Sequence, residues 1–495
     1  LPPVPPPAAV AAAPAPAARV VGVIPAQRNN PLLSGKIRSN PIPWESRKKM
    51  EEESRIIYPY PRFLGANDRR YDTHRNLDLI QDGEAPDGET VNDAIYHMDS
   101  VLVIDGQSAL INWSHFMFPT WQRKNIVDNG PALQEHNKRV KMLDPIVKSV
   151  IMESETPLHA LRKLYPNIVI IMTMDYNEYV KQPGIVYLSG LNKMERQIND
   201  FVDEKNGRPI NDVGPTLIFE DWTSWQHSSI PIFEYLLDSV MSPAAAKINE
   251  NLSSNTASCE CTKSCDHRGN PKCCANKSAT KVAYIKKKML GNTVKPRDGD
   301  DEEEPEDAVD MYECGDACKC DKTKCMQRAV QLGRRIPLVV FMHPEKSWTV
   351  RAGCYITKGN FVCSYLGEMI TAKEAAQRKD QMYQVDIKMK TTDGQYHNLV
   401  VDSLNMGNES RFIAHSCAPN LFTQRVHFEV EGRPKRHIAL FANRDIEAGE
   451  ELSFDYYHHY KDPVKFHNKI GFACKCGAST CREKAYQQMK RRSTT

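Results

Sequence analysis

Short hydrophobic runs, separated by polar and proline-rich stretches, divide this chain into several predicted folded units. Residues 101–104 and 109–113 have the length and the β-branched or aromatic content of strands. Hydrophobic positions over 131–143 then recur at a spacing compatible with a helix. This order of elements predicts a small α+β module over residues 94–140.

The rest of the N-terminal half gives weaker structural signals. Residues 1–90 are rich in proline, arginine and asparagine and have little periodicity, so we expect this proline-rich region to be mostly disordered. Residues 145–250 mix helix-like and strand-like stretches, which predicts a folded connector of unassigned fold. The densest hydrophobic run, 167–174, has the length of a strand and is far shorter than the about 20 residues that cross a bilayer.

Length and charge narrow the class of protein. A chain of 495 residues can form several domains, each with its own core. Its 65 basic and 62 acidic residues nearly balance, which excludes a polycation that coats nucleic acid. We therefore infer neither sequence-specific DNA binding nor a membrane partner.

The fifteen cysteines are absent from the first 258 residues, and twelve of them are clustered. This distribution is unlike a disulfide framework and is typical of metal thiolate sites in a reducing compartment. The first group has nine members, in two halves: Cys259, Cys261, Cys265, Cys273, Cys274, Cys314, Cys318, Cys320 and Cys325.

Ligand arithmetic relates these nine thiols to three zinc ions. Tetrahedral zinc takes four thiolates, so three ions need twelve ligand positions, and nine cysteines supply them if three cysteines bridge two ions each. Adjacent Cys273 and Cys274 suit neighbouring ions of one cluster. Disulfide pairing and a six-cysteine two-zinc DNA-binding cluster are the alternatives, although the latter does not use nine cysteines in two distant halves. Zinc held by thiolates alone has no open position, so its predicted role is structural.

Three further motifs follow this group in a fixed order. They are KSWTVRAGCYITKGNFVCSYLGEMI at 346–370, RFIAHSCAPN at 411–420 and GEELSFDYY at 449–457, and a compact cysteine tail comes after them. Together with the nine cysteines they resemble the pre-SET, SET and post-SET segments of the suppressor-of-variegation class of histone lysine methyltransferases. The resemblance implies a multi-domain protein with a pre-SET zinc cluster at 255–333, a mainly β SET fold with a knot-like active site at 334–460 and a post-SET zinc segment at 470–486.

The resemblance also implies residue roles at the active site. It assigns catalytic roles to Tyr456, Tyr365, Phe454 and His415. Contacts to S-adenosylmethionine, the methyl donor of this family, fall on Ser347, Trp348, Thr349, Tyr383, Arg411, Ala414, His415 and Phe472. The tail supplies three zinc ligands, Cys474, Cys476 and Cys481, and Cys417 is the expected fourth. Cys354 and Cys363 are expected to be buried small apolar residues.

Methyl transfer needs a neutral lysine amine, although the pKa of a free lysine is about 10.4. A narrow channel walled by aromatic rings disfavours the charged ammonium. We expect the Tyr456 hydroxyl to orient the amine, with Tyr365 as a second channel hydroxyl. A Phe at 454 leaves room for higher methylation, to the di- or trimethyl product.

Three positions depart from the family pattern. Ser347 and Thr349 stand where the family usually has glycines, and Ala414 stands where it usually has asparagine. Losing the asparagine removes a side-chain hydrogen bond worth about 1 kcal/mol. We therefore expect these substitutions to weaken cofactor affinity.

The run from Tyr96 through INWSHFMFPTW resembles a chromodomain. In that family Tyr96, Trp113 and Phe116 would form a methyl-lysine cage, with Trp121 in the following strand. A half-buried sheet with the same aromatic residues, without a cage, is the alternative.

These expectations together describe a nuclear, chromatin-bound enzyme that di- or trimethylates lysine 9 of histone H3 and promotes heterochromatin. Zinc is the predicted structural metal, S-adenosylmethionine the cosubstrate, and the histone H3 tail or nucleosome the partner. A SET-fold scaffold that binds tails without turnover, and a methyltransferase for non-histone proteins, are the two alternatives.

Overall fold

The computed structural model describes an N-terminal sheet, two long helices and most of the C-terminal half of the chain. The described residues are 98–105, 108–113, 120–123, 131–153, 185–206, 217–223, 229–250, 258–262, 265, 273–274, 284–285, 289–290, 310–322, 324–391, 395–458 and 460–493. The predicted disorder over 1–90 and the hydrophobic run 167–174 lie outside these residues.

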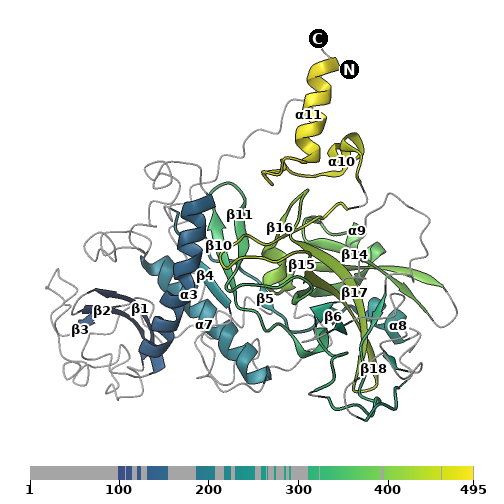
Figure 1. The fold of residues 1–495 in the computed structure, drawn as a ribbon, viewed down its shortest axis with the longest axis horizontal. Helices are drawn as coiled ribbons and strands as arrows, with labels where there is room; N and C mark the ends of the chain where they lie inside the picture. The colour runs from purple at the N-terminus through teal and green to yellow at the C-terminus, as the bar shows by residue number, and fades with distance from the viewer. Residues whose placement is uncertain are drawn as a thin grey trace.

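The N-terminal module is a three-stranded antiparallel sheet followed by a helix, at one end of the molecule (Figure 1). Its elements are β1 (Met98–Asp105), β2 (Ser108–Trp113), β3 (Thr120–Arg123) and α3 (Pro131–Glu153). The predicted strands 101–104 and 109–113 are both present, in β1 and the central β2, because Ala109, Leu110 and Ile111 supply a buried apolar centre.

Helix α3 is longer than the hydrophobic spacing predicted. It continues past Leu143, the expected end, and through Pro145 to Glu153. A proline inside a helix removes one backbone hydrogen bond, but Leu143 and Ile146 are both buried and continue the apolar face across it. The predicted module boundary at residue 140 therefore falls inside one helix.

The predicted connector is not a separate unit at its C-terminal end. It contains α7 (Ile185–Asn206), β4 (Leu217–Glu220), β5 (Glu234–Tyr235), β6 (Val240–Met241) and α8 (Pro243–Glu250). Strand β4 pairs in parallel with β10 (Leu338–His343), β5 with β15 (Tyr396–Gly407) and β6 with β13 (Gly367–Thr371). These three short strands complete sheets whose other strands lie more than a hundred residues away in sequence.

The C-terminal half is mainly β, as expected. Its sheets have the strand orders β11-β10-β4, β12-β18-β17-β9 and β14-β15-β13-β6, and a separate parallel pair joins β16 to β19. The remaining strands are β7 (Tyr284–Ile285), β8 (Met289–Leu290), β9 (Met311–Tyr312), β11 (Ser347–Ala352), β12 (Phe361–Tyr365), β14 (Gln384–Lys390), β16 (Ala414–His415), β17 (Leu421–Val430), β18 (Arg433–Ala442) and β19 (Ser453–Phe454). One hydrophobic core runs between these sheets and also takes in Leu191 and Ile198 of α7.

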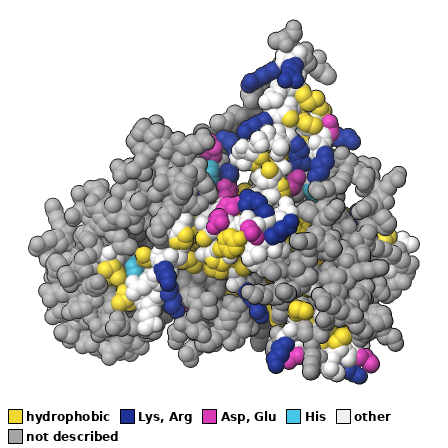
Figure 2. Space-filling model, in the orientation of Figure 1, with side chains coloured by type: hydrophobic (Ala, Val, Ile, Leu, Met, Phe, Trp, Pro, Cys, Tyr) yellow, Lys and Arg dark blue, Asp and Glu magenta, His cyan; other side chains and the backbone are white. Residues whose placement is uncertain are grey.

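Short helices lie at the edges of this β framework. They are η5 (Val330–Leu332), α9 (Ala372–Ala376), η6 (Glu409–Phe412), α10 (Pro463–Lys469) and α11 (Arg482–Ser493). Helix α11 projects from the body in Figure 1, and Figure 2 shows Lys and Arg side chains gathered on it. Among the described residues, no helix combines the length and the hydropathy needed to cross a bilayer.

Candidate active site and cysteine clusters

Two of the sequence motifs meet through the short parallel pair β16–β19. Ala414 lies opposite Ser453 and His415 opposite Phe454. Asn420 fastens the same motifs together, because its amide donates to the Glu451 carbonyl at 2.8 Å and accepts from the Ser453 N–H at 2.9 Å. The residues that the resemblance placed on two sides of one active site are therefore neighbours in space.

Tyr456 lies at this junction with its hydroxyl turned into the protein. The hydroxyl donates to the Ile413 carbonyl, and the Tyr456 N–H donates to His415 Nδ1 at 3.2 Å. The residue is 37% exposed, although its hydroxyl is bonded within the protein. The ring centroid of Phe454 lies 4.7 Å from that of Tyr456 and 6.4 Å from that of Tyr365. These three rings form one aromatic cluster.

Both tyrosine hydroxyls of the cluster remain protonated at neutral pH. Burial raises the pKa of Tyr365 and of Tyr456 well above the ordinary tyrosine value. Tyr365 donates to the Tyr383 carbonyl at 2.9 Å. The cluster thus offers two neutral O–H groups in apolar surroundings, and neither can act as a base at physiological pH.

His415 is buried beneath these rings. Burial lowers the pKa of His415 to about 4, so the ring is neutral and Nδ1 can accept the Tyr456 N–H. Phe466 stacks on one side of it at 5.6 Å, and Phe472, 42% exposed, lies edge-on to both His415 and Tyr456. The sequence reading missed Phe466, although Asp462 followed by Pro463 is a helix N-cap and N1 signature that predicts α10.

The Arg411 side chain is fixed by contacts with β15 and with the Tyr383 ring. Its Nε donates to the Ser403 carbonyl at 2.8 Å, its Nη2 donates to the Leu404 carbonyl at 2.9 Å, and its guanidinium lies 4.5 Å from the Tyr383 ring centroid. These contacts fasten η6 to β15 and so fix the start of the segment that carries Ile413.

The strand β11 carries the other predicted cofactor residues. Trp348 is half-buried, and its ring lies edge-on to Phe219 at 6.2 Å. Ser347 has a φ of 65°, in the left-handed region that favours glycine. A glycine would adopt this backbone without strain, which gives a local conformational reason for the glycine usual in the family, whereas Ser347 adopts it with strain.

We expect Ser347→Gly to raise the free energy of unfolding by about 0.5–1 kcal/mol, because the left-handed strain that it removes exceeds the larger entropy cost of ordering a glycine. Urea unfolding measures this change. Glu431→Gly is the matched control, since Glu431 has a φ of 52° in the β17–β18 turn, away from β11 in sequence. Equal stabilisation is expected from both variants, and a destabilised Ser347→Gly would show that the serine side chain has a compensating contact.

Thr349 is fully buried, and its Oγ1 has no hydrogen-bond partner within the described part of the chain. Replacing it with the isosteric valine removes a buried polar atom at constant volume. We expect Thr349→Val to raise the free energy of unfolding by about 1 kcal/mol, measured by urea unfolding. Loss of stability in this variant, together with tolerance of Thr349→Ser, would instead indicate a bonded hydroxyl.

The C-terminal cysteines converge on Cys417. The Sγ atoms of Cys417, Cys474, Cys476 and Cys481 all lie within 4.8 Å of one another. The Cys474 and Cys481 sulfurs are 3.8 Å apart, which matches the edge of a thiolate tetrahedron built from Zn–S bonds of about 2.3 Å. A disulfide would bring two sulfurs to about 2.05 Å. The donor set therefore fits a tetrahedral zinc.

Arg482, the residue after Cys481, fastens this group to the GEELSFDYY motif. Its guanidinium donates to the Asp455 carboxylate at 2.6 Å and to the carbonyls of Tyr457 and Tyr460 at 2.9 and 2.8 Å. The C-terminal segment is thereby positioned beside the aromatic cluster.

The nine earlier cysteines are almost all brought together in the same way. Three overlapping groups have sulfurs within 4.8 Å of one another: Cys259, Cys265, Cys314 and Cys320; Cys259, Cys274, Cys314 and Cys318; and Cys261, Cys265 and Cys273. Cys325 lies 3.9 Å from Cys314. Cys259, Cys265 and Cys314 each belong to two groups, as expected of a cluster in which some thiolates are shared between ions.

Two further sets of residues singled out in the sequence, the remaining cysteines and the predicted methyl-lysine cage, are not part of these clusters. Cys363 is buried in the main core and Cys354 is half-buried, and neither joins a cysteine group among the described residues. Of the predicted cage, Tyr96 and Phe116 lie outside the described residues, and Trp113 is described only through its backbone at the end of β2.

Comparison with known proteins shows which families two parts of this chain match. Residues 347–457 match the SET domain family, and residues 218–328 match the Pre-SET motif. The Pre-SET match begins at β4, well before the expected boundary at 255, whereas the SET match lies inside the expected range. The chain therefore contains a Pre-SET motif followed by a SET domain, and over this region it is similar to histone-lysine N-methyltransferases named Su(var)3-9.

Individual relatives agree with this class. The chain is 34% identical over 263 residues to the histone-lysine N-methyltransferase Su(var)3-9 of Drosophila melanogaster, covering 51% of this chain and 38% of that protein. It is 36% identical over 186 residues to the H3 lysine-9 specific histone-lysine N-methyltransferase of Schizosaccharomyces pombe, covering 35% and 37%. The solved structure of the Neurospora SET domain protein DIM-5 is 27% identical, with a TM-score of 0.39, and covers 53% of this chain and 99% of that one. The matched region thus spans less than two-fifths of the two full-length relatives.

Proposed function

We propose that this protein transfers methyl groups from S-adenosylmethionine to lysine 9 of histone H3 and carries that lysine to the di- or trimethylated state. The observation that carries the proposal is the junction of β16 and β19, where Tyr456, Tyr365 and Phe454 form one aromatic cluster. The choice of lysine 9 rests on the Su(var)3-9 class and on the relative whose name specifies that lysine.

The residues of this chain would prepare the lysine for attack. S-adenosylmethionine supplies an electrophilic methyl on a sulfonium. The incoming ammonium loses its proton to water, and the apolar cluster then favours the neutral amine over the charged form. Tyr456 and Tyr365 orient that amine through their hydroxyl oxygens, and both hydroxyls stay protonated because burial raises their pKa values. The C–S bond breaks as the C–N bond forms, leaving S-adenosylhomocysteine and a methylammonium.

Phe454 bears on the number of methyl groups added. It is buried against both tyrosine rings and carries no hydroxyl that would hold a water beside the amine. The room this leaves supports di- and trimethylation.

Zinc would be structural at both cysteine clusters. We assign three ions to the nine pre-SET cysteines and a fourth to Cys417 and the three C-terminal cysteines, on the basis of the sulfur separations. Thiolate coordination leaves no position open, so these ions hold the segments on either side of the active site without taking part in transfer.

The direct test uses the purified full chain, isotope-labelled S-adenosylmethionine and histone H3 tail peptides. Label is expected on the native peptide and absent from a peptide in which lysine 9 is replaced by arginine. Mass spectrometry of the product should show two or three methyl groups. Transfer to another lysine would overturn the site assignment, and transfer only to non-histone proteins would favour the alternative substrate class.

A scaffold that binds histone tails without turnover is the second candidate. The strained Ser347 and the alanine at position 414 favour it, because both lie on strands predicted to contact the cofactor. Tail binding with no transfer to any peptide would establish the scaffold.

Restoring the family residue at position 414 separates these two candidates further. Ala414 is half-buried, beside buried His415. We expect Ala414→Asn to tighten the binding of S-adenosylmethionine about fivefold, corresponding to one added hydrogen bond of about 1 kcal/mol. Isothermal titration calorimetry measures the affinity, and an unchanged affinity would mean that the alanine is harmless.

We assign the N-terminal module a reading function, on the basis of its chromodomain-like sequence and its sheet followed by α3. It would bind a methylated histone tail and keep the protein on chromatin in the nucleus. A trimethylated H3 peptide is expected to bind more tightly than the unmodified one, and Trp113→Ala should remove the difference. Equal affinities would favour a sheet without a cage.

A further inference from the structure

We propose that Arg139 and Glu195 are positioning residues that hold Phe219 against Trp348, so that the helices behind the N-terminal sheet set the affinity of the cofactor site. This inference rests on the proposed function, because it takes Trp348 as a cofactor contact. In this proposal the N-terminal module influences the cofactor site, because the helices packed behind its sheet bind strand β4.

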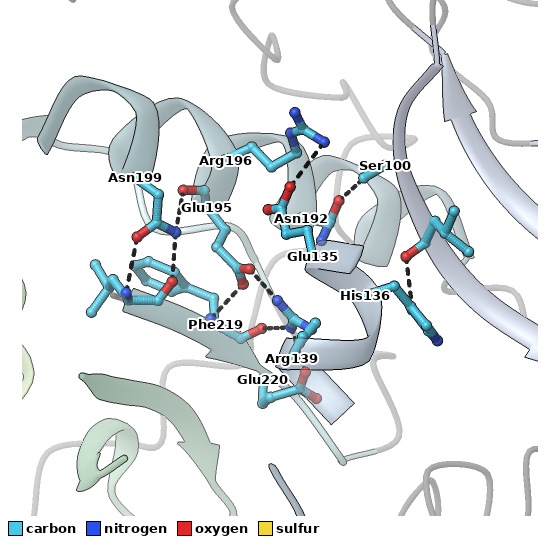
Figure 3. Close-up of polar contacts among 12 residues, drawn as sticks. Ser100, Glu135, His136, Arg139, Asn192, Glu195, Arg196, Asn199, Phe219 and Glu220 are labelled. Atoms are coloured by element: carbon cyan, nitrogen blue, oxygen red, sulfur yellow. Dashed lines mark hydrogen bonds and ion pairs between the residues drawn. The ribbon is translucent and has the colours of Figure 1, made fainter. Parts of the chain in front are cut away.

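The centre of this arrangement is an ion-pair network between three elements (Figure 3). Arg139 of α3 pairs with Glu195 of α7 and with Glu220 of β4. Its Nη2 also donates to the Phe219 carbonyl at 3.0 Å, while Glu195 accepts from the Phe219 N–H at 2.8 Å. Both backbone polar groups of Phe219 are therefore bound by members of one ion pair.

Asn199 makes the same kind of contact one turn further along α7. Its amide nitrogen donates to the Leu217 carbonyl at 2.7 Å, and its amide oxygen accepts from the Leu217 N–H at 2.9 Å. Strand β4 is the edge of the sheet β11-β10-β4, and these side chains bind the N–H and C=O groups that its free edge would otherwise expose. Side chains of α7 and α3 thus take the place of a neighbouring strand.

From β4 the contacts lead directly to the active site. The Phe219 ring lies edge-on to Trp348 at 6.2 Å and edge-on to Phe412 at 6.2 Å. Phe412 precedes Ile413, whose carbonyl accepts the Tyr456 hydroxyl. One ring therefore touches both the predicted cofactor strand and the segment that positions the catalytic tyrosine.

Helix α3 also contacts the far end of the cofactor strand. Gly353 follows β11, and a Cβ placed on it would lie 2.6 Å from the Met142 terminal methyl and 2.7 Å from the Pro337 carbonyl oxygen. The absence of a side chain at Gly353 lets α3 approach the hairpin β10–β11 this closely.

The same two helices are fastened to the N-terminal sheet. Ser100 of β1 donates to the Asn192 side chain of α7 at 2.5 Å, and Asn112 of β2 donates to it at 3.2 Å. His136 of α3 lies 3.0 Å from the Val101 carbonyl. A continuous set of contacts therefore joins β1 and β2 through α3 and α7 to Phe219, and through it to Trp348.

The ion pair between Arg139 and Glu195 is buried, so breaking it has a large energetic cost. The Arg139 and Glu195 side chains are only 15% and 2% exposed. Burial raises the pKa of Glu195 to about 7, against the opposing attraction of Arg139. Removing Arg139 alone leaves the carboxyl groups of Glu195 and Glu220 without their counter-charge, whereas neutralising all three side chains leaves no isolated charge in this network.

The test compares variants of the full chain by titration calorimetry with S-adenosylmethionine, with zinc content and melting temperature recorded for each. Arg139→Met is expected to raise the cofactor Kd and KM about tenfold, with a smaller change in kcat and unchanged zinc. Arg139→Met combined with Glu195→Gln and Glu220→Gln, which leaves no carboxylate without its counter-charge, should recover most of the affinity. The matched control is Arg196→Met, since Arg196 pairs with Glu135 between the same two helices at 3.4 Å and is drawn apart from the contacts to Phe219 and Glu220 in Figure 3. Its cofactor affinity is expected to equal that of the wild type.

Phe219→Leu keeps the backbone contacts of residue 219 and removes the aromatic ring that packs against Trp348. It therefore tests the proposal even if Arg139→Met does not fold. It should reproduce the tenfold rise. A lower melting temperature with unchanged Kd, in Arg139→Met or in Phe219→Leu, would show that the network is only structural and would overturn the inference. A wild-type chain that binds no S-adenosylmethionine would instead overturn the proposed function, and the two failures are distinguishable.

Discussion

Tyr456→Phe is expected to abolish methyl transfer while leaving the fold and the zinc content unchanged. The Tyr456 hydroxyl donates to the Ile413 carbonyl from inside the aromatic cluster, and Phe keeps the ring and removes only this group. Losing one positioned hydrogen-bonding group of this kind lowers kcat by about 10²–10³-fold. Single-turnover transfer of labelled methyl to the histone H3 tail measures the effect.

Tyr460→Phe is the control for this variant. Tyr460 is half-buried beyond the same motif and lies outside the cluster formed by Tyr365, Phe454 and Tyr456, so its transfer rate should stay near that of the wild type. Full activity in Tyr456→Phe would show that another group orients the amine.

Cys417→Ser is expected to release one zinc per chain, lowering the content from four to three, and to free the segment that follows residue 470. Structural zinc contributes about 10–16 kcal/mol of binding free energy at neutral pH, so one missing thiolate disrupts the whole site. Phe472 and Arg482 would then lose their positions beside His415 and Asp455, and methyl transfer should fall by more than about tenfold. Metal analysis and limited proteolysis measure the two changes.

Cys354→Ser provides the matched comparison, because Cys354 is half-buried and belongs to no cysteine group among the described residues. It should retain all four ions and full activity. A Cys417→Ser chain that keeps four zincs would mean that the three tail cysteines recruit a different fourth ligand.

Particular residues show how far the sequence could be read. Strands β1 and β2 and the sulfur groups were predictable, because hydrophobic alternation and cysteine spacing are local properties. The length of α3 was not, since Pro145 is a local stop signal that burial of Leu143 and Ile146 overrides. The pairing of β4 with β10 could not be predicted either, because a four-residue strand carries no information about a partner more than a hundred residues away.

At the candidate active site, too, some features could be predicted from the sequence and others could not. Its residue types, Tyr365, Phe454 and Tyr456, could be named from short motifs, and their chemistry follows from those side chains. Their mutual distances, and the burial that keeps both hydroxyls protonated, depend on how the sheets pack. The left-handed backbone of Ser347 could not be predicted either, because serine, unlike glycine, rarely adopts a positive φ.

The sequence by itself determined the resemblance to SET-domain methyltransferases, the cysteines available to zinc and the aromatic residues proposed for catalysis, because those depend on side-chain chemistry and short-range spacing. Only the tertiary structure decided which cysteines belong to two groups, which carbonyl accepts the Tyr456 hydroxyl and that Arg139 reaches Phe219. These are contacts between segments far apart in the chain, and they form only when packing of a shared core outweighs the entropy of closing the loops between them.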